Sequence, residues 1–82
     1  MMSMKNNQFN DKNLKEEVGK RLKERRLELQ MTQRQVAAQL GIAQPVYQRF
    51  EKGTFECSYA QLVSICKLFD ISADYVLGIS DY

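Results

Sequence analysis

Residues 32–53 read TQRQVAAQLGIAQPVYQRFEKG, and this stretch decides the fold. Thr32 is a residue type that caps helix N-termini, and Gln35 stands three residues later, where its side chain completes a capping box. Gly41 follows at the position where a helix that starts at Thr32 ends with a left-handed residue. These signals predict a short helix over residues 32–40. Its inward-facing side chains would be Val36, Ala37 and Leu40.

A second short helix follows directly. Pro45 lacks a backbone N–H and is tolerated only in the first turn of a helix, so this helix must begin near Gln44. Gly53 ends it, and the pattern predicts a helix over residues 44–51. Its inner face would consist of Phe50 together with Val46 or Tyr47. The two helices are joined by a turn around Gly41.

A longer helix precedes this pair. Leu14, Val18 and Leu22 recur at every fourth residue, with charged residues around them, which predicts an amphipathic helix over about residues 11–29. Residues 1–10 hold few apolar side chains, and we interpret them as a flexible N-terminal arm. We interpret four basic side chains of the helix as a solvated face: Lys20, Arg21, Lys23 and Arg25.

Two further helices follow the pair. Ser58 with Gln61 repeats the capping box, and Ser72 caps a short last helix that Gly78 ends. The inward-facing residues of the fourth helix would be Leu62, Ile65, Cys66 and Phe69. No strand pattern or internal repeat interrupts this series. The sequence therefore predicts one all-α, five-helix domain over residues 11–82.

Composition excludes several classes of protein. The chain has 82 residues, of which 44% are hydrophobic, enough for one compact core. It has no apolar run near the ~20 residues that cross a bilayer and no signal-peptide pattern, so we expect a cytoplasmic protein. There is no histidine, and Cys57 and Cys66, nine residues apart, would lie about 13 Å apart along one helix, too far for a disulfide. We therefore expect no metal site, no cofactor and no enzyme.

Charge is unevenly distributed although the net charge is only +2. Residues 1–52 carry eleven Lys and Arg against six Asp and Glu, a net of +5, whereas residues 53–82 carry one Lys against four acidic residues, a net of −3. The first part suits a polyanion such as a nucleic acid, and the second is free for a different role.

Several residues of the stretch and its flanks occur together at a characteristic spacing: Arg26, Thr32-Gln33, Val36-Ala37, Gly41 and Glu51-Lys52-Gly53. With this pattern the sequence resembles the phage-repressor-like (Xre/Cro-type) helix-turn-helix family over about residues 18–77. The resemblance implies a five-helix, lambda-repressor-like fold that binds double-stranded DNA. The helix over 32–40 would cross the DNA backbone, and the helix over 44–51 would be the recognition helix in the major groove.

The resemblance also implies which residues touch DNA. Gln44 matches the main base-reading position, and Gln and Arg side chains pair bidentately with adenine and guanine. The candidate base-reading residues are Gln44, Gln48, Arg49 and Pro45, the last through apolar contact with a thymine methyl group. The candidate phosphate contacts, at helix ends and in the first turn of the fourth helix, are Thr32, Gln33, Arg34, Lys52, Thr54 and Tyr59.

Four other positions complete the comparison with the family. Arg26 and Glu51 match positions that form a partly buried ion pair, which would tie the first helix to the end of the recognition helix. Ala43 stands where the family usually has a capping Ser or Thr, so the recognition helix loses a cap worth ~1 kcal/mol. Arg25 occupies a usually apolar position, so its side chain either reaches solvent or contacts a phosphate.

These observations predict a sequence-specific, homodimeric DNA-binding transcription regulator, most simply a repressor of bacterial or phage origin whose regulation involves its abundance, a partner protein or competition. The alternative is an antitoxin or adaptor whose helix-turn-helix mainly mediates protein–protein interaction. A steep loss of DNA affinity with salt distinguishes the first function from the second. Part of an apolar group near the C-terminus is a candidate dimer surface: Ile71, Tyr75, Val76, Leu77, Ile79 and Tyr82.

Overall fold

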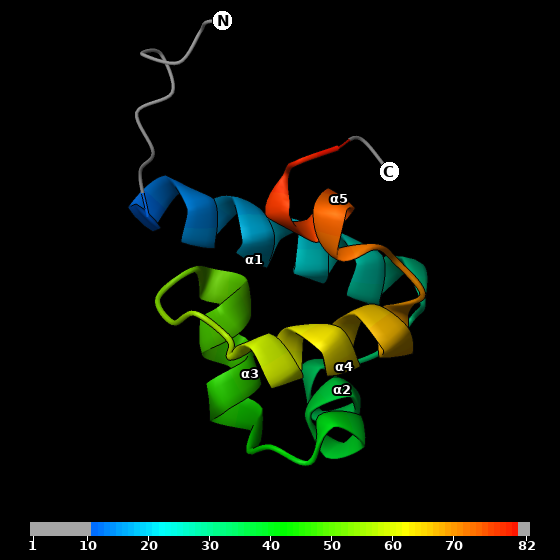
Figure 1. Ribbon diagram of the computed structural model, residues 1–82. Helices are drawn as coiled ribbons and strands as arrows, with labels where there is room; N and C mark the ends of the chain where they lie inside the picture. The colour runs from blue at the N-terminus through cyan, green and yellow to red at the C-terminus, as the bar shows by residue number, and fades with distance from the viewer. Residues whose placement is uncertain (1–10, 81–82) are drawn as a thin grey trace, which may run out of the picture.

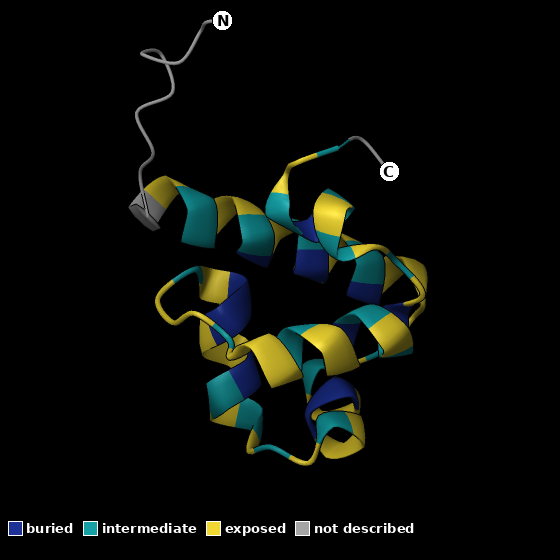
Figure 2. Ribbon diagram, in the orientation of Figure 1, coloured by how far each residue is buried: buried dark blue, intermediate teal, exposed yellow. Residues whose placement is uncertain are grey.

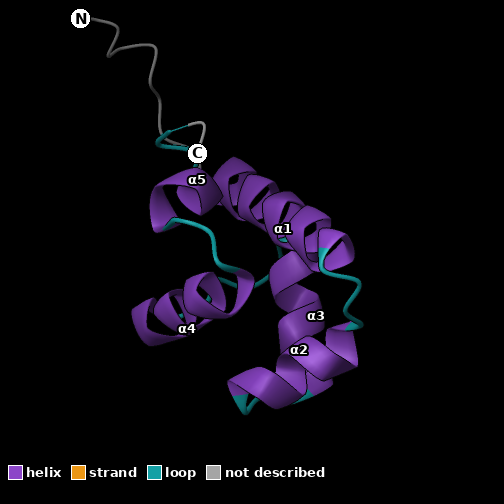
Figure 3. Cartoon of the chain, turned by 90° about the vertical axis from the view of Figure 1, so that its right-hand side faces the viewer, coloured by secondary structure: helices purple, strands orange, loops and turns teal. Residues whose placement is uncertain are grey.

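The computed structural model describes residues 11–80, and within that range the chain forms five helices and no strand (Figures 1 and 3). The helices are α1 (Asp11–Glu28), α2 (Gln33–Leu40), α3 (Gln44–Lys52), α4 (Tyr59–Phe69) and α5 (Ala73–Leu77). The predicted all-α, five-helix fold is confirmed, with helix ends within a residue or two of those expected. The arm predicted for residues 1–10, like Tyr82, lies outside the described residues.

The predicted capping signals set the helix boundaries. Thr32 Oγ1 accepts a hydrogen bond from the Gln35 backbone N–H at 3.0 Å, and the Thr32 N–H donates to Gln35 Oε1 at 2.8 Å. Ser58 and Gln61 repeat both bonds at the start of α4. Ala43 gives α3 no side-chain cap, as its residue type implies. Gly41 ends α2 with a φ of 70°, a conformation that glycine adopts without steric cost.

The core lies between all five helices, with buried residues facing the centre of the molecule (Figure 2). α3 packs against both α1 and α2, α4 against α2 and α5, and α5 against α1. Of the two inner-face alternatives for α3, Tyr47 is fully buried and Val46 only partly. The buried hydrophobic residues are Leu22, Val36, Ala37, Tyr47, Phe50, Ile65, Phe69 and Val76. No described helix has the length and apolar character to span a membrane.

α1 approaches the end of α3 closely, at Gly19. A Cβ atom on Gly19 would collide with the backbone oxygen of Glu51 and lie 2.7 Å from that of Phe50. The bare backbone of Gly19 therefore lets α1 run directly against the last turn of α3. This contact brings Arg26, two turns further along α1, to the same side of the molecule as Glu51.

Two of the four basic residues assigned to a solvated face of α1 do not belong to it. Arg25 Nε donates to the backbone oxygen of Phe69 at 2.8 Å, and Arg21 Nη1 donates to that of Val76 at 3.1 Å. These carbonyls belong to the last turns of α4 and α5, where helix carbonyls lack partners within the helix. The predicted solvated face is therefore wrong for Arg21 and Arg25, while Lys20 and Lys23 are exposed.

The apolar group near the C-terminus divides between core and surface. Val76 is fully buried, and Ile71 and Tyr75 pack against the core. Among the described residues of this group, Ile79 is the one that lies on the surface, where its side chain is 71% exposed. Most of the group is therefore explained by packing inside the molecule.

Candidate nucleic-acid interface

α3 has an inner face and an outer face. Tyr47, Phe50 and Glu51 are buried, and they hold the helix against α1 and α2. The candidate base-reading residues lie on the other side: Pro45, Gln48 and Arg49 are exposed, and Gln44 is half-buried at the first position of the helix. Because Gln48 and Arg49 stand four residues after Gln44 and Pro45, the four side chains form two adjacent rows on one surface. The structure therefore brings together the four residues proposed to read bases.

The six candidate phosphate contacts are spread over the start of α2, the end of α3 and the start of α4. Arg34 and Lys52 are exposed cations, and Tyr59 is 91% exposed. The hydroxyls of Thr32 and Thr54 already have local roles, since Thr32 caps α2 and Thr54 Oγ1 donates to the Arg49 backbone oxygen at 3.3 Å. Arg34, Lys52 and Tyr59 are therefore the side chains of this set with the most accessible polar ends.

Arg49 has a neighbour that the sequence did not suggest. Its guanidinium lies over the ring of Phe55, 5.0 Å from the ring centroid, and Phe55 is itself 49% exposed. A cation over an aromatic face is attracted to it by the ring quadrupole. Phe55 therefore restrains the direction in which Arg49 projects from α3.

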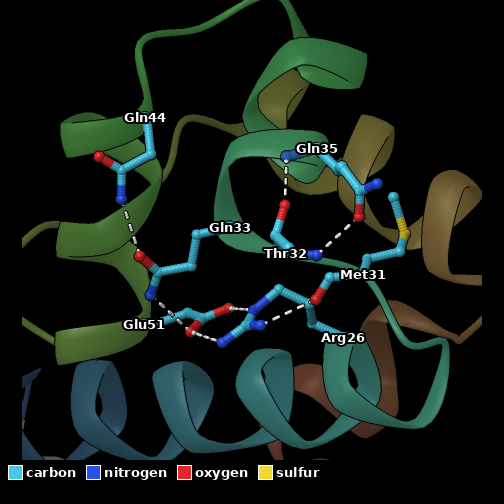
Figure 4. Close-up of polar contacts among 7 residues, drawn as sticks. All are labelled: Arg26, Met31, Thr32, Gln33, Gln35, Gln44 and Glu51. Atoms are coloured by element: carbon cyan, nitrogen blue, oxygen red, sulfur yellow. Dashed lines mark hydrogen bonds and ion pairs between the residues drawn. The ribbon is translucent and has the colours of Figure 1, made fainter.

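Arg26 and Glu51 form a bidentate, buried ion pair between α1 and α3 (Figure 4). Arg26 Nε donates to Glu51 Oε2 at 2.7 Å, and Arg26 Nη2 donates to Glu51 Oε1 at 3.0 Å. Arg26 Nη1 donates to the Met31 backbone oxygen at 2.9 Å, which fixes the plane of the guanidinium. The ion pair that the family resemblance implies is thus present. Arg26 makes a third hydrogen bond outside the pair, to the Met31 backbone oxygen.

The surroundings of Glu51 keep it ionised. Burial alone raises the pKa of the Glu51 carboxyl, but its interactions with Arg26, the nearby Tyr47 hydroxyl and Gln33 together outweigh this effect and hold the pKa below its usual value of 4.5. The same contact with Glu51 raises the pKa of Arg26. At neutral pH this carboxylate can therefore only accept hydrogen bonds.

A line of side-chain amides continues from this ion pair to the start of α3 (Figure 4). Gln33 Nε2 donates to Glu51 Oε1 at 3.0 Å, and Gln44 Nε2 donates to Gln33 Oε1 at 2.8 Å. Gln33 therefore holds Gln44 in place, a role distinct from the phosphate contact predicted for it. The residue types at positions 33 and 44 were visible in the sequence, but the short distance between the two helix starts was not.

Among residues 11–80 the structure shows neither a cluster of metal ligands nor an activated cysteine. No three His, Cys, Asp or Glu side chains within this range come together as metal ligands do. Burial raises the pKa of the Cys57 and Cys66 thiols, opposite to the change that activates a nucleophilic cysteine.

Comparisons with known proteins agree with this geometry. The model of the helix-turn-helix family matches residues 22–76. The uncharacterized HTH-type transcriptional regulator YqaE of Bacillus subtilis (strain 168) is 39% identical over 56 residues, which are 68% of this chain and 48% of that protein. The uncharacterized HTH-type transcriptional regulator YobD of the same organism is 34% identical over 61 residues, 74% of this chain and 54% of that protein. The chain thus spans about half the length of the curated relatives it matches. On the family match, together with α2, the turn and α3, the chain belongs to the helix-turn-helix family.

Proposed function

We propose that this protein binds double-stranded DNA and regulates transcription, with α3 in the major groove and α2 across the backbone. The observation that carries the proposal is the outer surface of α3, where Gln44, Gln48 and Arg49 project from a helix whose other face is fixed in the core. Both relatives are named as transcriptional regulators, which supports the same function. A regulator of this kind acts in the cytoplasm, where bacterial DNA lies.

In the proposed complex, each candidate residue has a distinct task. Gln44 and Gln48 present amides, which pair with adenine, and Arg49 presents a guanidinium, which pairs with guanine. Pro45 offers apolar contact to a thymine methyl group. Phosphates on either side of the groove are bound at Thr32, Gln33, Arg34, Lys52, Thr54 and Tyr59, where exposed cations and the N-terminal dipole of α2 attract negative charge.

The protein acts most simply as a homodimeric repressor. One small domain makes few phosphate contacts, so tight specific binding calls for two domains on half-sites about one helical turn of DNA apart. A regulator that covers such a site near a promoter blocks transcription by occupancy alone.

Selection from a randomised duplex pool tests this function. We expect wild-type protein to enrich an inverted repeat with half-sites ~10 bp apart, with affinity that falls steeply as salt rises. Gln44→Ala should change or abolish the preference at one base of each half-site. Gln39→Ala, an exposed glutamine of α2 outside the candidate interface, is the matched control and should select the wild-type sequence. Failure to enrich any sequence, with affinity indifferent to salt, would favour the protein-interaction function instead.

A further inference from the structure

We propose that Phe55 is a positioning residue that holds the Arg49 guanidinium where two of its N–H groups reach one guanine, and so makes Arg49 discriminate guanine from adenine. The proposal rests on the proposed function, in which Arg49 reads a base from the outer face of α3. Phe55 does not touch DNA in this arrangement. It acts through Arg49, whose guanidinium carbon lies 5.0 Å from the centroid of the Phe55 ring.

The turn after α3 fixes Phe55 beside Arg49. Gly53 ends the helix with a φ of 79°, a left-handed conformation that turns the chain back along the last turn of α3. The Arg49 backbone oxygen then accepts hydrogen bonds from the Thr54 N–H at 3.1 Å, the Phe55 N–H at 3.4 Å and the Thr54 hydroxyl at 3.3 Å. The backbone of Phe55 is therefore bonded to the backbone of the residue whose side chain its ring contacts.

The Phe55 ring is also held by its apolar surroundings. Its exposed fraction is 49%, and it lines an apolar hollow between α1 and α4 together with Val18 and Leu62. Burial of part of the ring stabilises this placement. The ring therefore offers the Arg49 guanidinium a fixed surface, which a fully solvated side chain would not.

The contact leaves the hydrogen-bond donors of Arg49 available. Arg21, Arg25 and Arg26 commit N–H groups to oxygen atoms of the protein. The Arg49 guanidinium makes no hydrogen bond or ion pair within residues 11–80. An aromatic ring attracts a cation through its quadrupole and supplies no oxygen or nitrogen acceptor. Phe55 thus restrains the charge of Arg49 without occupying the N–H groups that would read a base.

This restraint bears on discrimination between the two purines. Guanine and adenine both present an acceptor at N7 in the major groove, and they differ at the neighbouring atom, which is the O6 acceptor in guanine and the N6 donor in adenine. A guanidinium that bonds N7 and O6 together distinguishes the two bases. One that bonds N7 alone, or swings to a phosphate, does not. By limiting these alternatives, Phe55 favours the two-bond contact and lowers the entropy lost when Arg49 binds.

The experiment measures the preference for guanine as the ratio of dissociation constants for two duplexes. One duplex is that enriched by wild-type protein, and the other carries adenine in place of the guanine whose preference disappears in Arg49→Ala. Phe55→Leu keeps an apolar side chain but removes the aromatic face, whereas Phe55→Tyr keeps the face. Phe55→Leu is also combined with Arg49→Ala. Leu27→Ala, which changes another half-exposed apolar side chain outside the candidate interface, is the matched control.

We expect wild type, Phe55→Tyr and Leu27→Ala to share the same preference for guanine. Phe55→Leu should reduce that preference about three- to tenfold, and it should have no further effect when Arg49 is already alanine. A merely structural role would weaken both duplexes equally and leave the ratio unchanged. If urea unfolding shows that Phe55→Leu is not folded, Phe55→Met supplies the same test, since it also lacks an aromatic face.

Three results would overturn the inference. The first is an unchanged preference for guanine in the folded variant without an aromatic face. The second is an equal loss of affinity from Phe55→Leu in wild type and in Arg49→Ala, which would show that Phe55 contacts DNA directly. The third is an Arg49→Ala protein with unchanged base preferences and a weaker salt dependence, which would make Arg49 a phosphate contact.

None of these three results would remove the proposed function, because Gln44 would still be the candidate base reader. The proposed function itself fails if wild-type protein enriches no duplex, and the inference then fails with it.

Discussion

Arg26 and Glu51, 25 residues apart in the sequence, join α1 to the end of α3 through two hydrogen bonds of 2.7 and 3.0 Å. Both side chains are buried, so each charge depends on the other for the hydrogen bonds that water would otherwise supply. Glu51 also accepts a hydrogen bond from the Gln33 amide, and Gln33 in turn accepts one from the Gln44 amide. One ion pair therefore serves two purposes: it fixes α1 against α3, and it anchors the amides at the surface proposed to meet DNA.

Arg26→Ala should destabilise the protein by about 3–5 kcal/mol, because it leaves the Glu51 carboxylate buried and unpaired. DNA affinity should fall as well, since the amides of Gln33 and Gln44 lose their anchor. Arg26→Lys should retain only part of the stability, because an ammonium cannot reproduce the two parallel hydrogen bonds. Urea unfolding measures the change in free energy, with Lys23→Ala, an exposed cation of the same helix, as the control. Unchanged unfolding and binding in Arg26→Ala would contradict this role.

Acid should weaken the fold in a manner that depends on Glu51. The pKa of Glu51 is held below its usual value of 4.5 in the folded protein, so the unfolded chain takes up a proton first as the pH falls. Its contribution to stability is therefore complete above pH 4.5 and is lost as the pH falls through the lower, folded pKa. Urea unfolding at a series of pH values should show a smaller acid-induced loss in Glu51→Gln than in wild type. Parallel curves for the two proteins would show that Glu51 is not the group responsible.

Local signals made the helices predictable from the sequence. Thr32 and Ser58 each stand three residues before a glutamine, and the capping box needs only these neighbours. Gly41 and Gly53 end their helices in the left-handed conformation, which glycine adopts without steric cost. Pro45 fixes the first turn of α3, and this start determines which residues of the helix share its outer face with Gln44.

Long-range contacts between polar groups were not predictable in the same way. Arg25 and Arg21 donate to backbone oxygens 44 and 55 residues away, and a backbone acceptor has no sequence signature. The family resemblance implied the Arg26–Glu51 pair but did not connect it to Gln33 and Gln44. That connection depends on how closely α2 and the start of α3 approach each other in space.

Arg25→Ala should lower stability without a specific loss of DNA affinity. Its Nε bonds the Phe69 backbone oxygen at 2.8 Å, so the side chain is committed to the end of α4 and is not directed at a phosphate. Loss of this charged hydrogen bond should cost about 1–2 kcal/mol of unfolding free energy. DNA binding measured well below the melting temperature should match that of Lys23→Ala. A drop in the salt dependence of binding for Arg25→Ala would instead identify a phosphate contact.

Gly19→Ala should destabilise the protein, although the same change at an exposed helix position stabilises by about 0.5–1 kcal/mol. The added Cβ would collide with the backbone oxygen of Glu51, and backbone cannot move aside as a flexible side chain does. α1 would have to shift away from α3, which also disturbs the Arg26–Glu51 pair. Thermal unfolding checks the sign, and Glu24→Ala at an exposed position of α1 should have little effect. A higher melting temperature in Gly19→Ala would show that the close approach is absent in solution.

Tyr47→Phe should stabilise the protein by about 1 kcal/mol, because it removes a buried hydroxyl that makes no hydrogen bond within the described residues. The ring is fully buried and stacks edge-on against Phe50, with centroids 6.3 Å apart, and phenylalanine preserves both features. Burial also raises the pKa of Tyr47, so the hydroxyl stays neutral and supplies no charge to the nearby ion pair. The matched control is Tyr59→Phe, which alters a side chain that is 91% exposed and should change stability by less than about 0.5 kcal/mol. Urea unfolding compares the two variants with wild type. A loss of stability in Tyr47→Phe alone would mean that the hydroxyl takes part in the Arg26–Glu51 network, and that this network extends further into the core than the hydrogen bonds of the structure show.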